Sequence, residues 1–270
     1  MEPFLRSALR PKGMEWAEIP PSPWQGVRFV DSHLHMEGDG AREALALAQA
    51  SGILLLSCGV DRKSSSACLR LASANQSVMA FVGVHPSEVS KERSTAWVRR
   101  ALETATGVGE VGLDPKYSPV GQKSAQLKAF TSQLAEAARA GKPVQVHSRG
   151  AEEECLDALA SAGLKRVLMH WFQAEESLPR VLDSGYFVSF GPSFIYSKRL
   201  QRMAARCDPS QVLPETDFPV GFGPLGGARG PLLVPSVVFR LSEVWGMPFE
   251  EARMTTCRNV MRFVGSSEKG

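Results

Sequence analysis

Eight short apolar runs, rich in branched residues, alternate with longer amphipathic stretches along most of this 270-residue chain. Short apolar runs are typical of buried strands, and the stretches between them have helical spacing. The runs cover residues 27–31, 53–57, 79–84, 107–111, 143–147, 166–170, 186–190 and 211–215. Alternating strands and helices predict parallel strands joined by right-handed crossovers, and eight such units in about 250 residues predict an α/β fold of the (β/α)8 TIM barrel type.

The stretches between and after the strands predict helices. They cover residues 41–51, 61–75, 87–104, 122–140, 151–162, 174–183, 197–205, 232–245 and 249–264. An open doubly wound sheet is the alternative architecture. No G-x-G-x-x-G follows the first strand, and no G-x-x-x-x-G-K-[ST] occurs in the chain. The commonest nucleotide-binding reasons to prefer the open sheet are therefore missing.

The chain ahead of the first strand differs from the rest. Residues 1–26 contain several prolines and are expected to form an irregular leader, followed by one barrel domain over 27–265. The leader has no apolar core typical of a secretion signal, and no apolar run is long enough to cross a membrane. No obligate protein partner is evident. The net charge of +3 neither indicates nor excludes a nucleic-acid partner.

The five cysteines are scattered and form no C-x-x-C pair. This spacing argues against a disulfide framework and against a structural zinc site. We therefore expect a reducing compartment, and predict a cytoplasmic location.

All five histidines fall where a predicted strand ends. They are His33 and His35 after the first strand, His85 after the third, His147 at the end of the fifth and His170 at the end of the sixth. Active sites of TIM barrels lie at the C-terminal ends of the strands. Side chains alternate faces along a strand, so His33 and His35 point the same way. We therefore predict a shared metal site at this end of the barrel.

Two carboxylates join this set, Glu110 in the fourth strand and Asp217 after the eighth. A catalytic zinc takes about three protein ligands, so six ligands suit two divalent ions, zinc, manganese or magnesium, better than one. The expected metal ligands are His33, His35, Glu110, His147, His170 and Asp217. His33 and His35 would hold one ion, His147 and His170 the other, with Glu110 as the bridge. Asp217 is expected beside the first pair because a closed barrel makes strands one and eight neighbours.

Paired metal ions are a recurrent solution for hydrolysing phosphate esters and some amides, because they activate water and stabilise transition-state charge. Glu110 and Asp217 are therefore the predicted catalytic residues, and Asp217 can also accept a proton from water. A lysine at the end of the fourth strand would have favoured a carboxylated-lysine site, but that position offers Glu110.

Other polar residues near the strand ends allow two interpretations each. His85 either caps its strand end or donates to a substrate oxyanion or phosphate. Arg149 either grips phosphate in a bidentate way or begins a helix at the surface. Glu215 either orients a ligand or forms an internal salt bridge. Asp114 either caps the turn after Gly112 or takes part in the site. His85 and Arg149 are the predicted substrate-binding residues.

With these residues in place, the chain resembles the TatD family of metal-dependent hydrolases over about residues 27–265. The matching segments, in family order, are 30–35 (VDSHLH), 83–86 (GVHP), 109–114 (GEVGLD), 143–149 (PVQVHSR), 170–172 (HWF) and 215–217 (ETD). The resemblance implies a TIM barrel with two or three divalent ions, and hydrolysis of DNA as a 3′-exonuclease or endonuclease. By their positions in these motifs, the resemblance also implies that the six residues named above bind the metal ions and that His85 and Arg149 contact the substrate.

Three segments depart from the family pattern: 171–174, 115–117 and 218–223. These segments are expected at the rim of the pocket, where substrate is selected. One alternative is therefore a metal-dependent hydrolase of a small amide, lactone or ester, in a closed pocket lined by Trp171, Phe172, Phe218 and Phe222. A barrel that binds a metal or a partner without catalysis is a further alternative, which the complete ligand set disfavours.

Overall fold

A computed structural model of the chain describes residues 27–38, 40–92, 94–116, 123–227 and 229–266. The leader expected over residues 1–26 lies outside this part of the chain.

The strands belong to one eight-stranded sheet whose order follows the sequence. They are β1 (Phe29–Leu34), β2 (Ile53–Cys58), β3 (Val78–Val82), β4 (Gly107–Gly112), β5 (Val144–His147), β6 (Val167–Met169), β7 (Phe187–Phe190) and β8 (Val212–Pro214). The pairs from β3 to β7 are parallel, and β1 also contacts β8. A doubly wound sheet would place its first strand between later ones. The sequential order instead confirms the TIM barrel.

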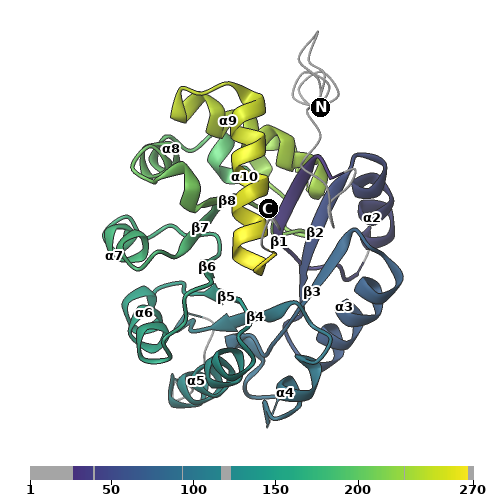
Figure 1. Cartoon of the computed structure of the whole chain (residues 1–270), viewed down its shortest axis with the longest axis vertical. Helices are drawn as coiled ribbons and strands as arrows, with labels where there is room; N and C mark the ends of the chain where they lie inside the picture. Colours follow the sequence, from purple (N-terminus) through teal and green to yellow (C-terminus); the bar gives the residue numbers. More distant parts are fainter. Residues whose placement is uncertain (1–26, 39, 93, 117–122, 228, 267–270) are drawn as a thin grey trace. The chain divides into compact units, whose positions relative to one another are not determined.

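Helices follow the strands at the positions that the pattern predicts. They are α2 (Ala41–Ala50), α3 (Arg62–Ala74), α4 (Trp97–Ala101), α5 (Lys123–Ala140), α6 (Glu152–Ser161), α7 (Leu178–Asp183), α8 (Lys198–Ala204), α9 (Val234–Trp245) and α10 (Phe249–Val264). Figure 1 shows α3 to α7 around the outside of the strands β3 to β6. The helices bury the outer face of these strands and the barrel interior buries the other face, which explains their nearly continuous apolar sequences.

The helix expected over residues 87–104 is the main difference. The structure has a short 3-10 turn, η1 (Pro86–Glu88), and the separate five-residue helix α4. Polar side chains hydrogen-bond the local backbone here: His85 accepts from Ser87 N, and Ser94 Oγ accepts from Ala96 N. Such bonds compete with helical ones and shorten the helix.

The described residues cluster into two compact units. The first unit contains the residues up to Leu56 and Ser189–Met261, and the second contains Ser57–Val188 and the residues from Arg262. In the second unit, Phe263 stacks on Phe81 with ring centroids 5.8 Å apart, and its edge meets Phe187 at 5.9 Å. These rings fill the interior between β3 and β7.

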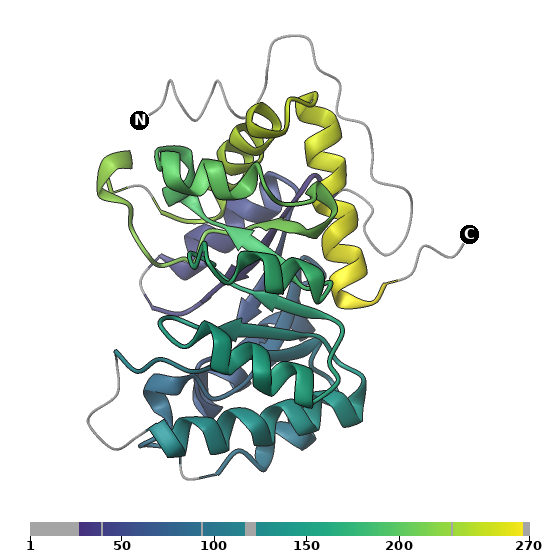
Figure 2. The ribbon, with the colours of Figure 1, turned by 90° about the vertical axis from the view of Figure 1, so that its left-hand side faces the viewer.

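The first unit is held by the last long helix. Asn259 Nδ2 of α10 donates to the carbonyl oxygens of Pro209 and Val212, at 2.8 and 2.9 Å, just where β8 begins. Arg253, which is almost fully buried, donates to the carbonyl oxygen of Arg28 at 2.7 Å and pairs with Glu250. These contacts fix β1 and β8 against α10; His33 lies in β1, and Asp217 follows the end of β8. Figure 2 shows the green helix α8 beside the olive helix α9, and Trp245 of α9 donates to the Ala204 carbonyl oxygen.

Among the described residues, no single helix has the length and apolar character needed to cross a membrane. One bent pair, Pro231–Trp245 with Phe249–Val264, passes that test by length and composition.

Candidate metal centre

Two histidines and one aspartate meet in the first unit. His33 lies within β1 and His35 follows its end, so both imidazoles leave the strand on one face. The Nε2 atoms of His33 and His35 lie 3.7 and 3.5 Å from Asp217 Oδ1. His33 is fully buried, while the His35 side chain is 18% exposed. One edge of this group is therefore open to solvent.

The backbone between β8 and Asp217 explains this meeting. Asp217 has a left-handed backbone, with φ 49, and its N–H donates to the His33 carbonyl oxygen at 3.0 Å. One residue earlier, the backbone N–H of Thr216 donates to the buried Asp31 carboxylate at 2.9 Å, and the Thr216 hydroxyl also donates to it. Burial raises the pKa of Asp31 well above its usual value, although the two Thr216 hydrogen bonds oppose that shift. Asp31 thus ties the end of β8 to β1.

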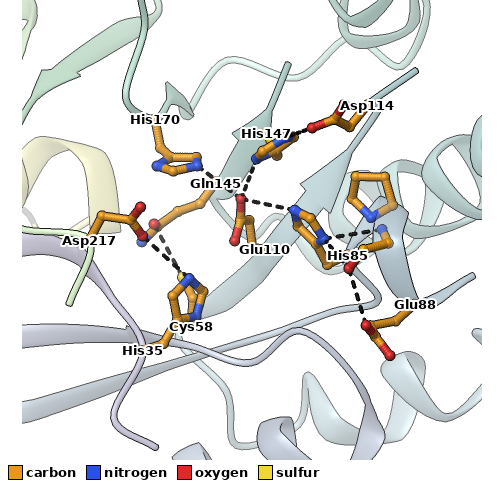
Figure 3. A network of polar contacts seen from close by, with 12 residues as sticks. His35, Cys58, His85, Glu88, Glu110, Asp114, Gln145, His147, His170 and Asp217 are labelled. Atoms are coloured by element: carbon orange, nitrogen blue, oxygen red, sulfur yellow. Dashed lines mark hydrogen bonds and ion pairs between the residues drawn. The ribbon is translucent and has the colours of Figure 1, made fainter. Parts of the chain in front are cut away.

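A single carboxylate lies among three imidazoles in the second unit. Glu110 Oε1 is 2.8 Å from His147 Nδ1, 2.9 Å from His170 Nε2 and 3.4 Å from His85 Nε2 (Figure 3). Burial alone would raise the pKa of Glu110. The electrostatic attraction of His85 and His170 and the hydrogen bonds from His147 and His170 outweigh it, and hold that pKa well below the usual value. Glu110 is therefore ionised at neutral pH.

Two glycines of β4 allow this arrangement. A Cβ on Gly109 would come within 2.9 Å of the Gln145 Cβ, so β4 approaches β5 closely beside Glu110. A Cβ on Gly112, where φ is 150, would lie 1.8 Å from the His147 carbonyl oxygen. That carbonyl accepts instead from Leu113 N at 3.0 Å. Only glycine fits at residue 112, and the turn there directs the next residues toward His147.

Asp114 is the site residue that the sequence pattern did not assign. It caps its turn as expected, with Oδ1 accepting from Lys116 N at 2.8 Å, but its Oδ2 lies 2.7 Å from His147 Nε2. Asp114 is fully buried. Burial lowers the pKa of His147, but Asp114 and Glu110 on opposite sides of the ring outweigh burial and raise it. Without a metal, both ring nitrogens of His147 therefore donate to carboxylates.

His85 differs from the other imidazoles of this group. Its Nδ1 accepts from the Ser87 backbone N–H at 3.1 Å and lies 2.8 Å from Ser87 Oγ. A neutral ring whose Nδ1 accepts must carry its proton on Nε2. The Nε2–H of His85 faces Glu110 and has no lone pair for a metal ion. The ring both caps the turn after β3 and presents a donor, so the two interpretations of His85 are compatible.

The ligand geometry fits divalent ions. Ligand bonds of about 2.0–2.2 Å at tetrahedral angles place neighbouring ligand atoms about 3.4 Å apart. The 3.5 and 3.7 Å separations around Asp217 Oδ1 match this spacing. In the second unit, the ligand atoms nearest to Glu110 Oε1 are His147 Nδ1 at 2.8 Å and His170 Nε2 at 2.9 Å. The closer Glu110 contacts with His147 and His170 are hydrogen bonds, which would lengthen by about half an ångström on metal binding.

A family model described as TatD related DNase matches residues 30–265. The chain belongs to the TatD family. A Mycobacterium tuberculosis TatD-family chain, named as a metal-dependent hydrolase, is 29% identical over 261 residues, covering 88% of this chain and 98% of its own. The human deoxyribonuclease TATDN3 is 28% identical over 260 residues, covering 88% of this chain and 94% of its own. A crystal structure of the TatD homologue YJJV from Escherichia coli superposes with a TM-score of 0.80 at 25% identity, covering 88% of this chain and 98% of that one.

The remaining TatD-family predictions concern the rim of the pocket. Arg149 is exposed in the turn between β5 and α6, and its role as a phosphate contact stays a prediction. The rings of Phe172, Phe218 and Phe222 are 2%, 2% and 5% exposed. Rings this deeply buried fill space within their own units, and they give little support to an aromatic pocket lining. Glu215, also buried, accepts from Ser189 Oγ at 2.6 Å, which favours neither of its two interpretations.

Proposed function

We propose that this TatD-family protein is a metal-dependent phosphodiesterase that hydrolyses DNA. The observation that carries the proposal is the ionised Glu110 carboxylate held against the imidazoles of His147 and His170, with the Nε2–H donor of His85 beside it. An anionic oxygen surrounded by imidazoles is a donor set for a divalent cation. The names of the family and of its human member support DNA as the substrate class.

The proposed centre takes two divalent ions, zinc, manganese or magnesium. His33, His35 and Asp217 would supply one set of ligands and His147 and His170 the other, with Glu110 as the bridge expected from the sequence. Such ions supply Lewis-acid stabilisation of phosphoryl charge and lower the pKa of water. Which of these metals binds depends on the geometry of the ligands and on the supply of each metal in the cell. The activity of the protein is therefore tested with each metal in turn.

The side chains of the chain itself complete the reaction. Asp217 is partly accessible and can take a proton from the attacking water. The Nε2–H of His85 points toward the centre of its group and can donate to a phosphate oxygen as negative charge develops. The Arg149 guanidinium, exposed after β5, can bind a neighbouring phosphate with two parallel hydrogen bonds.

The test compares the metal-loaded protein with two variants, Glu110→Gln and His147→Ala. The substrates are end-labelled single-stranded DNA, bis(p-nitrophenyl) phosphate and p-nitrophenyl acetate, each with and without a chelator. We expect cleavage of both phosphodiesters, loss of activity with chelator, and a loss of about a thousandfold or more in each variant. Cleavage of the acetate ester with both phosphodiesters untouched would instead establish the small-molecule hydrolase.

The cysteines bear on the cellular compartment. All five are buried and free of disulfides. Burial raises the pKa of Cys207 and Cys257 to about 12, so these thiols are unreactive at neutral pH. A reducing, cytoplasmic location is our proposal, and fractionation of the native cells tests it.

A further inference from the structure

The helix α8 carries a concentration of positive charge. No aspartate or glutamate occurs between Asp183 and Asp208, while four cations do. These cations, Lys198, Arg199, Arg202 and Arg206, are all exposed. Tyr196, just ahead of the helix, is also exposed, at 41%. We call these five residues the α8 basic face.

The helix is fixed by its opposite side. Leu200, Met203 and Ala204 are buried, and the Ser197 hydroxyl caps the first turn by accepting from Leu200 N. Lys198 and Arg202 are four residues apart and therefore lie on one face, where like charges cost a few tenths of a kcal/mol. At a rise of 1.5 Å per residue, the cations extend over about 12 Å. The repulsion between Lys198 and Arg202 opposes folding, and their place on one exposed face favours a role in binding.

Two acidic residues lie on the segments next to α8, one just after it and one on the packed helix α9, and both take part in further contacts. Asp208 caps the next turn by accepting from Ser210 N at 2.8 Å. Glu243, the acidic residue of the packed helix α9, pairs with Arg240 at 2.5 Å. Residues 196–208 carry four cations and one carboxylate, so this segment has a net charge of +3.

The α8 basic face begins near the ligand group of the first unit. Phe190, the last residue of β7, accepts a hydrogen bond at 3.1 Å from Glu215 N, two residues before Asp217. Gly191 then packs against the Glu215 side chain, and six residues later the chain enters α8. Tyr196 thus stands at the end of α8 that is connected to the strand ends carrying Asp217.

We propose that the α8 basic face binds single-stranded DNA, with its cations on successive phosphates and the Tyr196 ring stacked on a base. A positive surface beside an exposed aromatic ring is the combination that binds single strands without sequence preference. The inference rests on the proposed function, since it assigns the surface that holds the substrate strand. The duplex is excluded as the preferred partner because its bases offer no free face to Tyr196.

The test measures binding of fluorescein-labelled oligo-dT by fluorescence anisotropy, in a chelator so that nothing is cleaved. Lys198→Gln with Arg202→Gln removes two phosphate contacts. We expect affinity to fall on the order of tenfold and the slope of log affinity against log salt to drop by about 1.4. Arg99→Gln with Arg100→Gln removes two exposed arginines of α4 and is the matched control, expected to bind like the unaltered protein.

Tyr196 is tested in the same assay. Tyr196→Ala is expected to weaken binding about tenfold without altering the salt slope, because stacking is uncharged, and Tyr196→Trp is expected to restore it. Equal binding and equal slope for the α8 and α4 double variants would overturn the inference. So would tighter binding of a duplex than of oligo-dT.

Hydrolysis of bis(p-nitrophenyl) phosphate separates this inference from the proposed function, since a small diester does not reach α8. Reporter cleavage by a protein that does not bind oligo-dT overturns the inference and leaves the phosphodiesterase standing. Binding of oligo-dT through α8 by a metal-loaded protein that cleaves neither diester supports the inference and overturns the proposed function.

Discussion

Asp114 Oδ2 and His147 Nε2 lie 2.7 Å apart, and the aspartate is fully buried. With an ion bound, Nε2 would carry the one remaining ring proton and donate it to Asp114, and the Nδ1 lone pair would face the ion. The pair therefore selects which nitrogen of His147 is presented to the metal.

Asp114→Ala removes this selection. We expect the affinity for zinc to fall about 10–100-fold, the usual effect of losing such an orienting carboxylate. Competition with a chromophoric chelator measures that affinity. Asp114→Asn keeps an acceptor oxygen, so its zinc affinity is expected to lie between those of the alanine variant and the unaltered protein. Imidazole ¹⁵N spectra of the metal-free alanine variant should show that Nε2 of His147 has lost its fixed proton. If the zinc affinity and the spectra are both unaltered, Asp114 only caps its turn.

His85 is predicted to act as a donor and not as a ligand. His85→Asn keeps a side-chain donor of different reach and should lower hydrolysis of bis(p-nitrophenyl) phosphate by about 100-fold or more, as for loss of one transition-state donor. The metal content of the purified protein should stay unchanged, because Nε2 has no lone pair to lose. His170→Asn is the comparison variant, and it should lower both the rate of hydrolysis and the metal content. A loss of metal in His85→Asn, measured by atomic absorption, would make His85 a ligand.

The barrel was predictable because its signal is repeated along the chain. Each strand of the structure begins within two residues of its predicted start, since buried parallel strands require apolar runs. The grouping of His33 with His35 also followed from the sequence, because strand periodicity fixes the face of each side chain.

The Asp114 contact was not predictable in the same way. It depends on the turn at Gly112, where the His147 carbonyl oxygen occupies the space that a Cβ would need. No periodicity reports such a close approach. The proton position on His85 likewise depends on a backbone N–H two residues away, and the short helix α4 depends on local hydrogen bonds of Ser87 and Ser94. These features are set by single contacts, whereas patterns report averages over many residues.

Gly112→Ala tests the close approach directly. The new Cβ would lie 1.8 Å from the His147 carbonyl oxygen, so β4 and β5 must separate. We expect a loss of more than about 3 kcal/mol in the free energy of unfolding, measured by urea denaturation, together with weaker metal binding. Gly163→Ala is the control, since that glycine also has positive φ but nothing within 4 Å. It should cost about 1 kcal/mol. Equal losses in the two variants would mean that backbone strain alone explains the effect.

The cap of α3 gives a pH-dependent prediction away from the metal ligands. Asp61 accepts from Ser64 N at 2.7 Å, and the two residues form a capping box. Burial tends to raise the pKa of Asp61, but the hydrogen bonds from Ser64 and Lys63 and the charge of Lys63 outweigh it and lower that pKa below the usual 3.8. A lowered pKa in the folded state means that ionised Asp61 stabilises the fold above pH 3.8, and that this stabilisation is lost as the pH falls through the lowered value.

Asp61→Ala should therefore lower the free energy of unfolding by about 1 kcal/mol at neutral pH. The difference in this free energy between the variant and the unaltered protein should shrink as the pH falls toward about 3 and below. Urea denaturation across this range measures it, and a difference that stays constant with pH would assign the cap to geometry rather than to the charge.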